Sequence, residues 1–530
     1  MHIHPLTLPE IVLIIGKHIP LWIPEIGVDG TAWLFRPKDL VATISINRLF
    51  HKTLTPLLWT VCAYPHDESI KYLSSSYQGG HCRLNEVTPN IIRKNSIFIR
   101  YLDLSYNYGE KLYTLDRLQL TCTRLKELKL PQDMYSSDMA PLSRLLQANP
   151  GLRYLKWKRY SKLYFASNYI KVIFPLRQLR HLCLMEWSIN SVYLHHILCN
   201  NANSLEELEL GHWSRVPHRP PMNENWNGLD LTTEFSLTNE EQTEAAELIQ
   251  GRSLLLRNLK TLHLLNRWDR ADERAVCNLV RAFPALETLI IGFVYNDTAL
   301  LLGKVMKECC PNIRSIQGKP DYMTGDGSLP GYDGIGYVVG GCLPGKLVDF
   351  SLNRQEFDAK LADALMEHRN GLEILNVELS DKDLIIQSCT NVRKVLEGCR
   401  RLKEFSMRIN HAQYKEQDTF DVLIGLKVCR TLERLSFYGP LCAERDDLGR
   451  SDEAEEGTMV GYGAGDEPLC HIFILLSGWQ HSKSNEDDHR YRRPLTDAFK
   501  NKVFENVRDI PALKNVELNE DLFQKMAVVD

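Results

Sequence analysis

The chain reads RLKELKL at residues 124–130, GLRYLKW at 151–157, QLRHLCL at 178–184 and SLEELEL at 204–210. From its second residue, each stretch follows the pattern L-x-x-L-x-L, with occasional exchange for another large apolar residue. With IFIRYLDL upstream, the first positions of the pattern stand at 99, 125, 152, 179 and 205, so the steps are 26, 27, 27 and 26 residues. A step held over successive units indicates a repeat architecture and disfavours an ordinary βα domain.

The repeats continue downstream with interruptions. Units start at 259, 286 and 313 with steps of 27 residues, and then at 347, 372, 402 and 432 with steps of 34, 25, 30 and 30. We therefore expect insertions at about 211–240, 318–345 and 440–470. Residues 444–467 hold nine acidic and two basic residues, which predicts a solvated loop, with an acidic lure for a basic target as the alternative.

Each unit combines a strand with a helix. Leucines that alternate with polar residues predict a short strand with one face inward, and residues 297–309 place Ala299, Leu302 and Met306 on one side of a helix. A second helix is predicted from Thr238. One strand and one helix cannot bury both apolar faces, so neighbouring units must stack. The expected fold is an α/β leucine-rich-repeat solenoid, with parallel strands on a concave face and helices on a convex face.

Composition narrows the class of protein. The 530 residues carry a formal net charge of −4 and are 44% hydrophobic, which excludes a disordered or fibrous chain and gives no sign of a polybasic binder. No run of eighteen apolar residues predicts a membrane span. The 14 cysteines form no CxxC or metal-type cluster, so we interpret them as scattered small hydrophobes in a reducing compartment, cytoplasmic or nuclear, with no cofactor expected.

The first 65 residues do not follow the repeat step. They contain LPEI at 8–11, DL at 39–40, SINRLF at 45–50 and LTPLLW at 54–59. In this order the motifs resemble an F-box, and with the repeats the chain resembles the F-box/leucine-rich-repeat substrate receptors of SCF-type ubiquitin ligases, fungal members in particular. The chain departs from that family in two ways: residues 21–36 are longer than its usual link, and most repeats lack the asparagine that often follows the strand.

The resemblance implies an F-box-like helical module at 1–65, a connector at 66–95 and the solenoid at 96–530. It also implies that the module binds a Skp-type adaptor, and through it cullin and RING subunits. The expected adaptor contacts are Leu8, Pro9, Ile11, Ile15, Leu40, Leu58 and Trp59. The alternative for these residues is that they cap the open end of the first repeat.

The strand face of the repeats is the expected surface for a protein target. Its outward residues alternate in charge, which disfavours a phosphate-tracking nucleic-acid site and matches a mixed protein interface. The candidate target contacts are Lys156, Lys158, His181, His263, Asn376, Arg408, Arg434 and Tyr438. The identity of the target is not readable from the sequence.

Signatures of an enzyme are weak. The glycine patterns at Gly334 and Gly461 are interpreted as flexible loops, because they lack the strand, helix and Lys-Ser/Thr of a phosphate-binding loop. The pair His195-His196 lies in a predicted helix with one ring buried, and Cys309-Cys310 ends another. Together with these weak signatures, the resemblance to F-box/leucine-rich-repeat receptors implies a non-enzymatic substrate receptor, with a leucine-rich-repeat interaction scaffold without a ligase role as the alternative.

Overall fold

The structure is a computed structural model of the chain. It describes residues 6, 8–19, 22–27, 30–35, 38–63, 89–105, 115, 120–130, 136–158, 167–185, 191–211, 253–265, 273–292, 296–319, 334–353, 356–379, 385–409, 422, 429, 431–439 and 471–476. The chain divides into two compact units. The first comprises Met1–Asn225 with Leu231–Asn258, and the second comprises Trp226–Asp230 with Leu259–Asp530.

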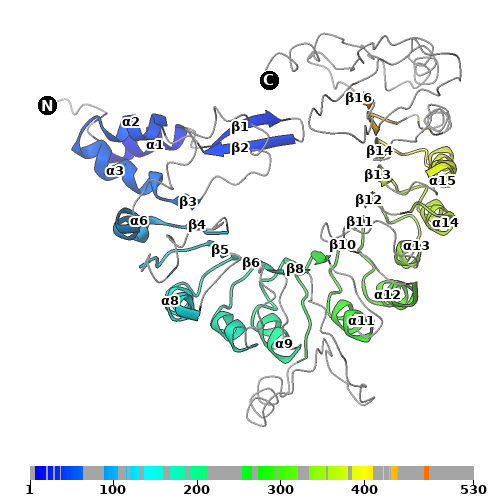
Figure 1. The fold of residues 1–530 in the computed structure, drawn as a ribbon, viewed down its shortest axis with the longest axis horizontal. Helices are drawn as coiled ribbons and strands as arrows, with labels where there is room; N and C mark the ends of the chain where they lie inside the picture. The colour runs from blue at the N-terminus through cyan, green and yellow to red at the C-terminus, as the bar shows by residue number, and fades with distance from the viewer. Residues whose placement is uncertain are drawn as a thin grey trace, which may run out of the picture. The chain divides into compact units, whose positions relative to one another are not determined.

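The first unit contains a run of parallel strands in sequence order. They are β3 (Val61–Ala63), β4 (Tyr101–Asp103), β5 (Glu127–Leu130), β6 (Tyr154–Lys158), β7 (His181–Met185) and β8 (Glu207–Gly211). Each strand pairs with the next, and the central leucines Leu128, Leu155, Leu182 and Leu208 lie opposite one another. The helices between them, drawn to one side of the strands in Figure 1, are α6 (Pro89–Asn95), α8 (Ser136–Gln147) and α9 (Ser191–Asn200), with 3-10 turns at Ser96–Phe98 and Ser167–Ile173.

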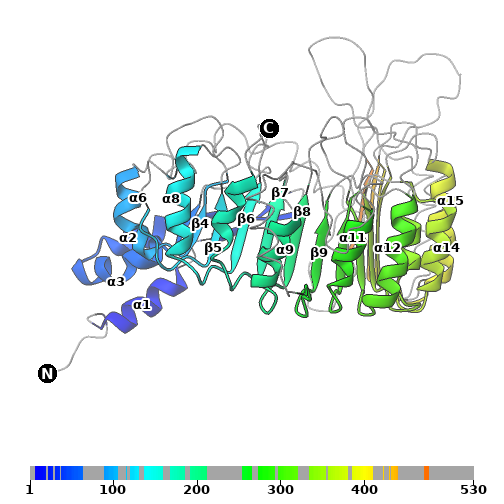
Figure 2. The same ribbon diagram turned by 90° about the horizontal axis from the view of Figure 1, so that it is seen from below.

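The second unit repeats this arrangement. Its strands are β9 (Thr261–Leu264), β10 (Thr288–Ile291), β11 (Ser315–Gly318), β12 (Asp349–Asn353), β13 (Ile374–Leu379), β14 (Glu404–Ile409), β15 (Arg434–Gly439) and β16 (His471–Leu476). Its helices are α11 (Glu273–Arg281), α12 (Asn296–Cys309), α13 (Ile335–Gly340), α14 (Ala359–Glu367) and α15 (Ile385–Gly398). Figure 2 shows α11 and α12 standing beside strands of this unit. The strands and helices confirm the repeat architecture, and α12 confirms the helix predicted over 297–309.

The core lies between the strands and the helices of each unit. Along β5 and β6, half-buried and fully buried residues alternate, and the buried ones are the leucines and Trp157. The alternation fails at Cys183 and Ile290. Each stands between two inward-facing apolar residues of its strand, where an outward side chain is expected, yet both are buried. Both lie between longer side chains on the neighbouring strands, so strand register, in addition to alternation, sets their exposure.

Several repeats place a buried hydrogen-bonding side chain after the helix, whereas Leu176 and Phe283 take the corresponding place in two others. Asn149 accepts a hydrogen bond from the backbone N–H of Leu125 at 2.7 Å and donates to the carbonyl of Cys122. Asn201, Cys310, His368 and Cys429 stand at corresponding places and bond the backbone of the preceding repeat. Because Cys122, Cys310, Cys399 and Cys429 all precede the first apolar residue of a repeat by three positions, the interpretation of the cysteines as scattered is wrong for these four.

Two predicted boundaries change in the structure. Parallel pairing begins with β3, inside the region that the sequence assigned to the helical module. Gly334 and Gly336, interpreted as part of a flexible loop, lie at the start of α13, a repeat helix with buried Ile335, Val338 and Val339. The other predicted insertions, the helix from Thr238 and the glycines from Gly461 lie outside the described residues.

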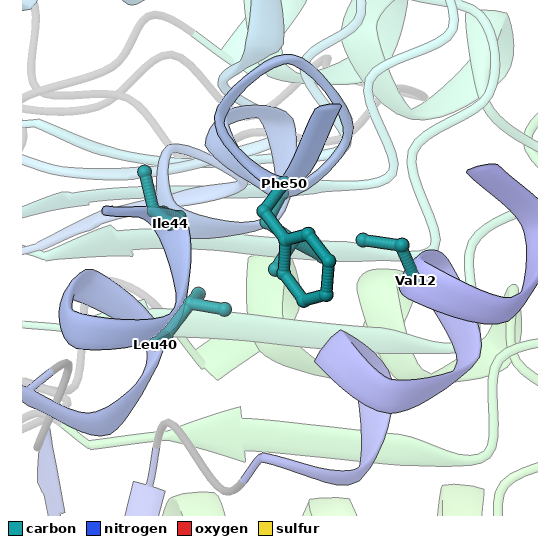
Figure 3. Packing of buried hydrophobic residues seen from close by; sticks show 5 residues of the cluster. Val12, Leu40, Ile44 and Phe50 are labelled. Carbon is teal, nitrogen blue, oxygen red and sulfur yellow. The ribbon is translucent and has the colours of Figure 1, made fainter. Parts of the chain in front are cut away.

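Three helices form a small N-terminal helical module in the first unit. They are α1 (Pro9–His18), α2 (Lys38–Ile44) and α3 (Arg48–Leu58). Proline at the first turn of α1 fits a helix start, and the side chain of Asn47 caps α3 by accepting from the Phe50 N–H at 3.0 Å. The module core consists of Val12, Leu40, Ile44, Phe50 and Leu54, and Figure 3 shows Val12 and Leu40 directed toward the Phe50 ring.

The link between α1 and α2 is structured. It contains an antiparallel hairpin of β1 (Trp22–Gly27) and β2 (Gly30–Phe35), with Gly27 opposite Gly30. The hairpin accounts for the additional length of residues 21–36. At Gly16 of α1, an added Cβ would overlap Leu54 and Leu57 of α3, so glycine permits the close contact of these two helices.

Candidate functional site

The structure gathers three predicted target contacts on neighbouring strands of the first unit. Lys156 and Lys158 lie on β6 opposite Cys183 and Met185 of β7, and His181 lies on β7 opposite Tyr154. We call this surface the β6–β8 cluster. It consists of Tyr154, Lys156, Lys158, His181, Cys183, Glu207 and Glu209.

His181 is the centre of the β6–β8 cluster. Its Nδ1 lies 2.8 Å from a carboxylate oxygen of Glu207, and its Nε2 lies 3.9 Å from a carboxylate oxygen of Glu209. The Tyr154 ring stacks against the imidazole with centroids 4.3 Å apart. The short contact to Glu207 assigns the proton of the neutral ring to Nδ1, since a carboxylate only accepts. The imidazole is therefore held between an aromatic ring and two carboxylates.

The titratable groups of the cluster are not arranged for nucleophilic chemistry. Cys183 is fully buried, and burial, together with the negative charge of Glu209, raises the pKa of its thiol well above the ordinary value, although Lys156 and Lys158 act in the opposite direction. Burial, followed by the charges of Cys183 and the nearby carboxylates, also raises the pKa of the Tyr154 hydroxyl. A reactive cysteine requires a lowered pKa. The cluster thus offers charged side chains of both signs, hydrogen-bonding groups and one aromatic ring, the composition of a protein-binding surface.

The predicted contacts of the second unit are spread over several strands. His263 is half-buried on β9, and Asn376 on β13 donates a hydrogen bond to the Ser351 hydroxyl at 3.2 Å. Arg434 on β15 forms an ion pair with Glu404 at 3.5 Å. Arg408 on β14 is exposed and lies opposite Tyr438 in register; the Tyr438 side chain lies outside what the structure describes. These residues do not form one site with His263.

The predicted adaptor contacts differ in exposure. Leu8 and Pro9 are exposed at the start of α1, and the side chains of Ile11, Ile15, Leu58 and Trp59 are half-buried. Leu40 has an exposed fraction of 0% and belongs to the module core. A side chain that is fully covered by its own module has no surface to offer a partner, so Leu40 does not belong to a contact surface in this structure.

Trp59 directly follows α3, close to the first parallel strand. Cys62 pairs with Leu102 in the parallel sheet, which puts Trp59, three residues earlier, at the place that Ile99 takes in the next repeat. The carbonyl of Thr60 also accepts from the amides of Arg100 and Tyr101 at 2.9 and 3.0 Å. The chain therefore passes from α3 into the first parallel strand through Trp59 and Thr60.

Three exposed apolar residues of α1, α2 and the link between α2 and α3 were absent from the predicted set. Ile14 is 51% exposed, Val41 44% and Ile46 63%, alongside Leu8 at 39%. Val12 and Gly16 are one helical turn apart and face α3. This spacing puts Ile14 on the opposite side of α1 and was the sequence signal for its exposure. We call Leu8, Ile14, Val41 and Ile46 the apolar module surface.

The fold defines the class of protein: an α/β chain of parallel strands and helices of leucine-rich-repeat type. A leucine-rich-repeat-containing protein from Legionella pneumophila is a similar solved structure, with 13% sequence identity, a TM-score of 0.34, and coverage of 58% of this chain and 90% of that chain. No family model matches the sequence, and no curated protein matches it. Among the described residues, no helix has the length and apolar character needed to cross a membrane.

Proposed function

We propose that the protein is the substrate-recognition subunit of an SCF-type ubiquitin ligase. In this proposal the N-terminal helical module docks a Skp-type adaptor, and the repeats bind a protein target. Ubiquitin transfer then occurs through proximity, with the chemistry carried by the cullin and RING subunits. The order of the F-box-like motifs in the sequence supports this proposal.

The observation that carries the proposal is the apolar module surface. The module fills its own core with Val12, Leu40 and Phe50, yet it leaves Ile14 and Ile46 more than half exposed. Exposed aliphatic side chains on two elements of a small module are typical of a docking site for a partner helix. The strand face, with the β6–β8 cluster, is the proposed surface for the target.

Adaptor capture tests the proposal. Full-length protein carrying Ile14→Asp and Ile46→Asp should capture a purified Skp-type adaptor about tenfold or more less well than the wild type, because a charge at the centre of an apolar interface must be desolvated. Both positions are exposed, so circular dichroism should report an unchanged fold. Leu300→Asp/Leu301→Asp is the matched control, since these exposed leucines lie on α12 in the second unit.

The result separates the two candidate functions. Loss of capture in the module variant with retention in the control supports the receptor. A wild-type chain that captures no adaptor refutes the ligase role and leaves the leucine-rich-repeat interaction scaffold, which rests on the mixed, aromatic strand face alone.

A further inference from the structure

A row of basic residues lies at the N-terminal ends of successive strands in the first unit. It consists of the residue after the first apolar position of each repeat: Arg100, Lys126, Arg153 and Arg180. Arg100, Arg153 and Arg180 are exposed, and Lys126 is half-buried. We call these four residues the basic edge row. They belong neither to the β6–β8 cluster nor to the apolar module surface.

Backbone hydrogen bonds fix the spacing of the row. The amide of Lys126 donates to the carbonyl of Arg100 at 2.7 Å, that of Arg153 to Lys126 at 2.9 Å, and that of Arg180 to Arg153 at 2.7 Å. Successive members thus stand just before the first residues of adjacent strands, about 4.8 Å apart, and the row is about 14 Å long. It is bounded in the same hydrogen-bond series by Thr60 and Glu206.

The same position in the second unit shows how these side chains normally interact. There Lys260 forms an ion pair with Glu287 at 3.8 Å, and Lys403 forms one with Glu373 at 2.7 Å. Side chains at this position therefore reach across one repeat, and charges of opposite sign stand next to each other. Lys403 also lowers the pKa of the Glu373 carboxyl.

The basic edge row lacks this compensation. Arg180 pairs with Glu206 at its end of the row at 3.4 Å, but among the described residues no carboxylate forms an ion pair with Arg100, Lys126 or Arg153. Like charges on directly adjacent strands destabilise a sheet. We infer that the row is a docking surface for an acidic segment of a protein partner, whose carboxylates supply the missing counter-charges.

The neighbouring charges favour protein over nucleic acid. Glu127, the first residue of β5, follows Lys126, and Glu207, the first residue of β8, follows Glu206. A continuous phosphate backbone would therefore meet negative charge beside the row. The length of about 14 Å matches a few residues of extended peptide, whose carboxylates sit on flexible side chains and can avoid Glu127. The inference rests on the proposed function in one respect, because the acidic segment would belong to the protein target. It does not depend on adaptor docking.

Peptide binding by the full-length protein tests the inference. The probe is a fluorescein-labelled poly-glutamate peptide, measured by anisotropy at low ionic strength and compared with a poly-serine peptide of equal length. Lys126→Glu/Arg153→Glu should weaken poly-glutamate binding about tenfold or more. The control, Lys260→Glu/Arg314→Glu, makes the same change in charge at the same repeat position and should leave the affinity unchanged.

Thermal stability gives a second measurement, and it should increase where peptide affinity decreases. Because Arg153→Glu alone places a carboxylate between Lys126 and Arg180, it should raise the thermal midpoint while weakening peptide binding. A lowered midpoint would indicate a structural role for Arg153 and would contradict the inference.

Three binding results would overturn the inference. They are no poly-glutamate binding by the wild type, equal losses in both double variants, and tighter binding of oligo-dT than of the peptide. Adaptor capture by Lys126→Glu/Arg153→Glu should equal that of the wild type, so a failure of the receptor proposal and a failure of this inference are distinguishable.

Discussion

A buried polar or sulfur side chain after the helix fixes several repeats to the previous one. Asn149 and Asn201 use an amide at this position, and His368 uses both ring nitrogens. Cys310 and Cys429 donate S–H to carbonyl oxygens of the preceding repeat at 3.4 and 3.3 Å. Burial raises the pKa of both thiols to about 12, so they remain donors at neutral pH. Different residue types thus satisfy the same backbone groups.

His368 makes stability depend on pH. The ring is fully buried, its Nδ1 accepts from the Leu347 amide at 3.4 Å, and its Nε2 lies 3.3 Å from the Val339 carbonyl. Burial lowers the pKa of the imidazole below its usual value of 6.5. The unfolded chain therefore binds a proton before the folded chain does, and stability present above about pH 6.5 is lost as the pH falls toward the folded pKa.

Replacing His368 should remove that dependence. The variant His368→Asn keeps one acceptor and donor groups but does not titrate, so between pH 7.5 and 5.5 its free energy of unfolding should fall less steeply, by at most about 1.4 kcal/mol per pH unit. Urea unfolding at several pH values measures the slope. His51→Asn removes an exposed imidazole and is the control. Identical slopes for His368→Asn and the wild type would contradict the role of His368.

At the scale of elements, glycines let α12 and α13 touch through their backbones. A Cβ on Gly303 would overlap the Tyr337 carbonyl oxygen, and one on Gly341 would overlap the backbone of Gly303. The glycine-rich composition near 334–341 therefore serves close helix contact, and helices that end in glycine resemble loops when only composition is considered.

Gly303→Ala should separate these helices. We expect a loss of about 1–3 kcal/mol in the free energy of unfolding, because the added methyl group meets rigid backbone. Gly340→Ala is the matched control, since its Cβ would lie 3.9 Å from the Ala364 side chain in ordinary contact, and the substitution should be neutral or slightly stabilising. Denaturant unfolding compares the two. Equal stability of both variants would show that the α12–α13 contact adapts.

Sequence periodicity predicted the elements better than it predicted their surfaces. The pattern around Leu128 and Leu155 located the strands, because a buried strand face requires an apolar residue at every second position. The exposure of Leu40 on α2 and of Ile14 on α1 was not predicted, because it depends on how these helices pack against α3, and the spacing of Val12 and Gly16 indicates the buried side of α1 only once that contact is known. The contact of His181 with Glu207 depends on strand register, and the basic edge row lies just outside the alternating positions considered for the strand face.

At the scale of the whole molecule, the stacking of repeats predicts that a destabilising substitution lowers the stability of nearby repeats only. Each strand contacts its sequence neighbours, as in repeat proteins whose stability is a sum of nearest-neighbour terms. Leu155 in the first unit and Leu375 in the second are both fully buried as the second residue of a strand, so the same substitution can be made at equivalent positions of the two units.

Hydrogen exchange on the full-length protein should reveal this locality. Leu155→Ala should cost about 2–5 kcal/mol and lower amide protection in β5, β6 and β7 while leaving β12, β13 and β14 unchanged, and Leu375→Ala should do the reverse. Each variant is the control for the other, because the atoms removed are identical. Equal loss of protection in both sets of strands for either variant would show that the two compact units unfold as one cooperative body.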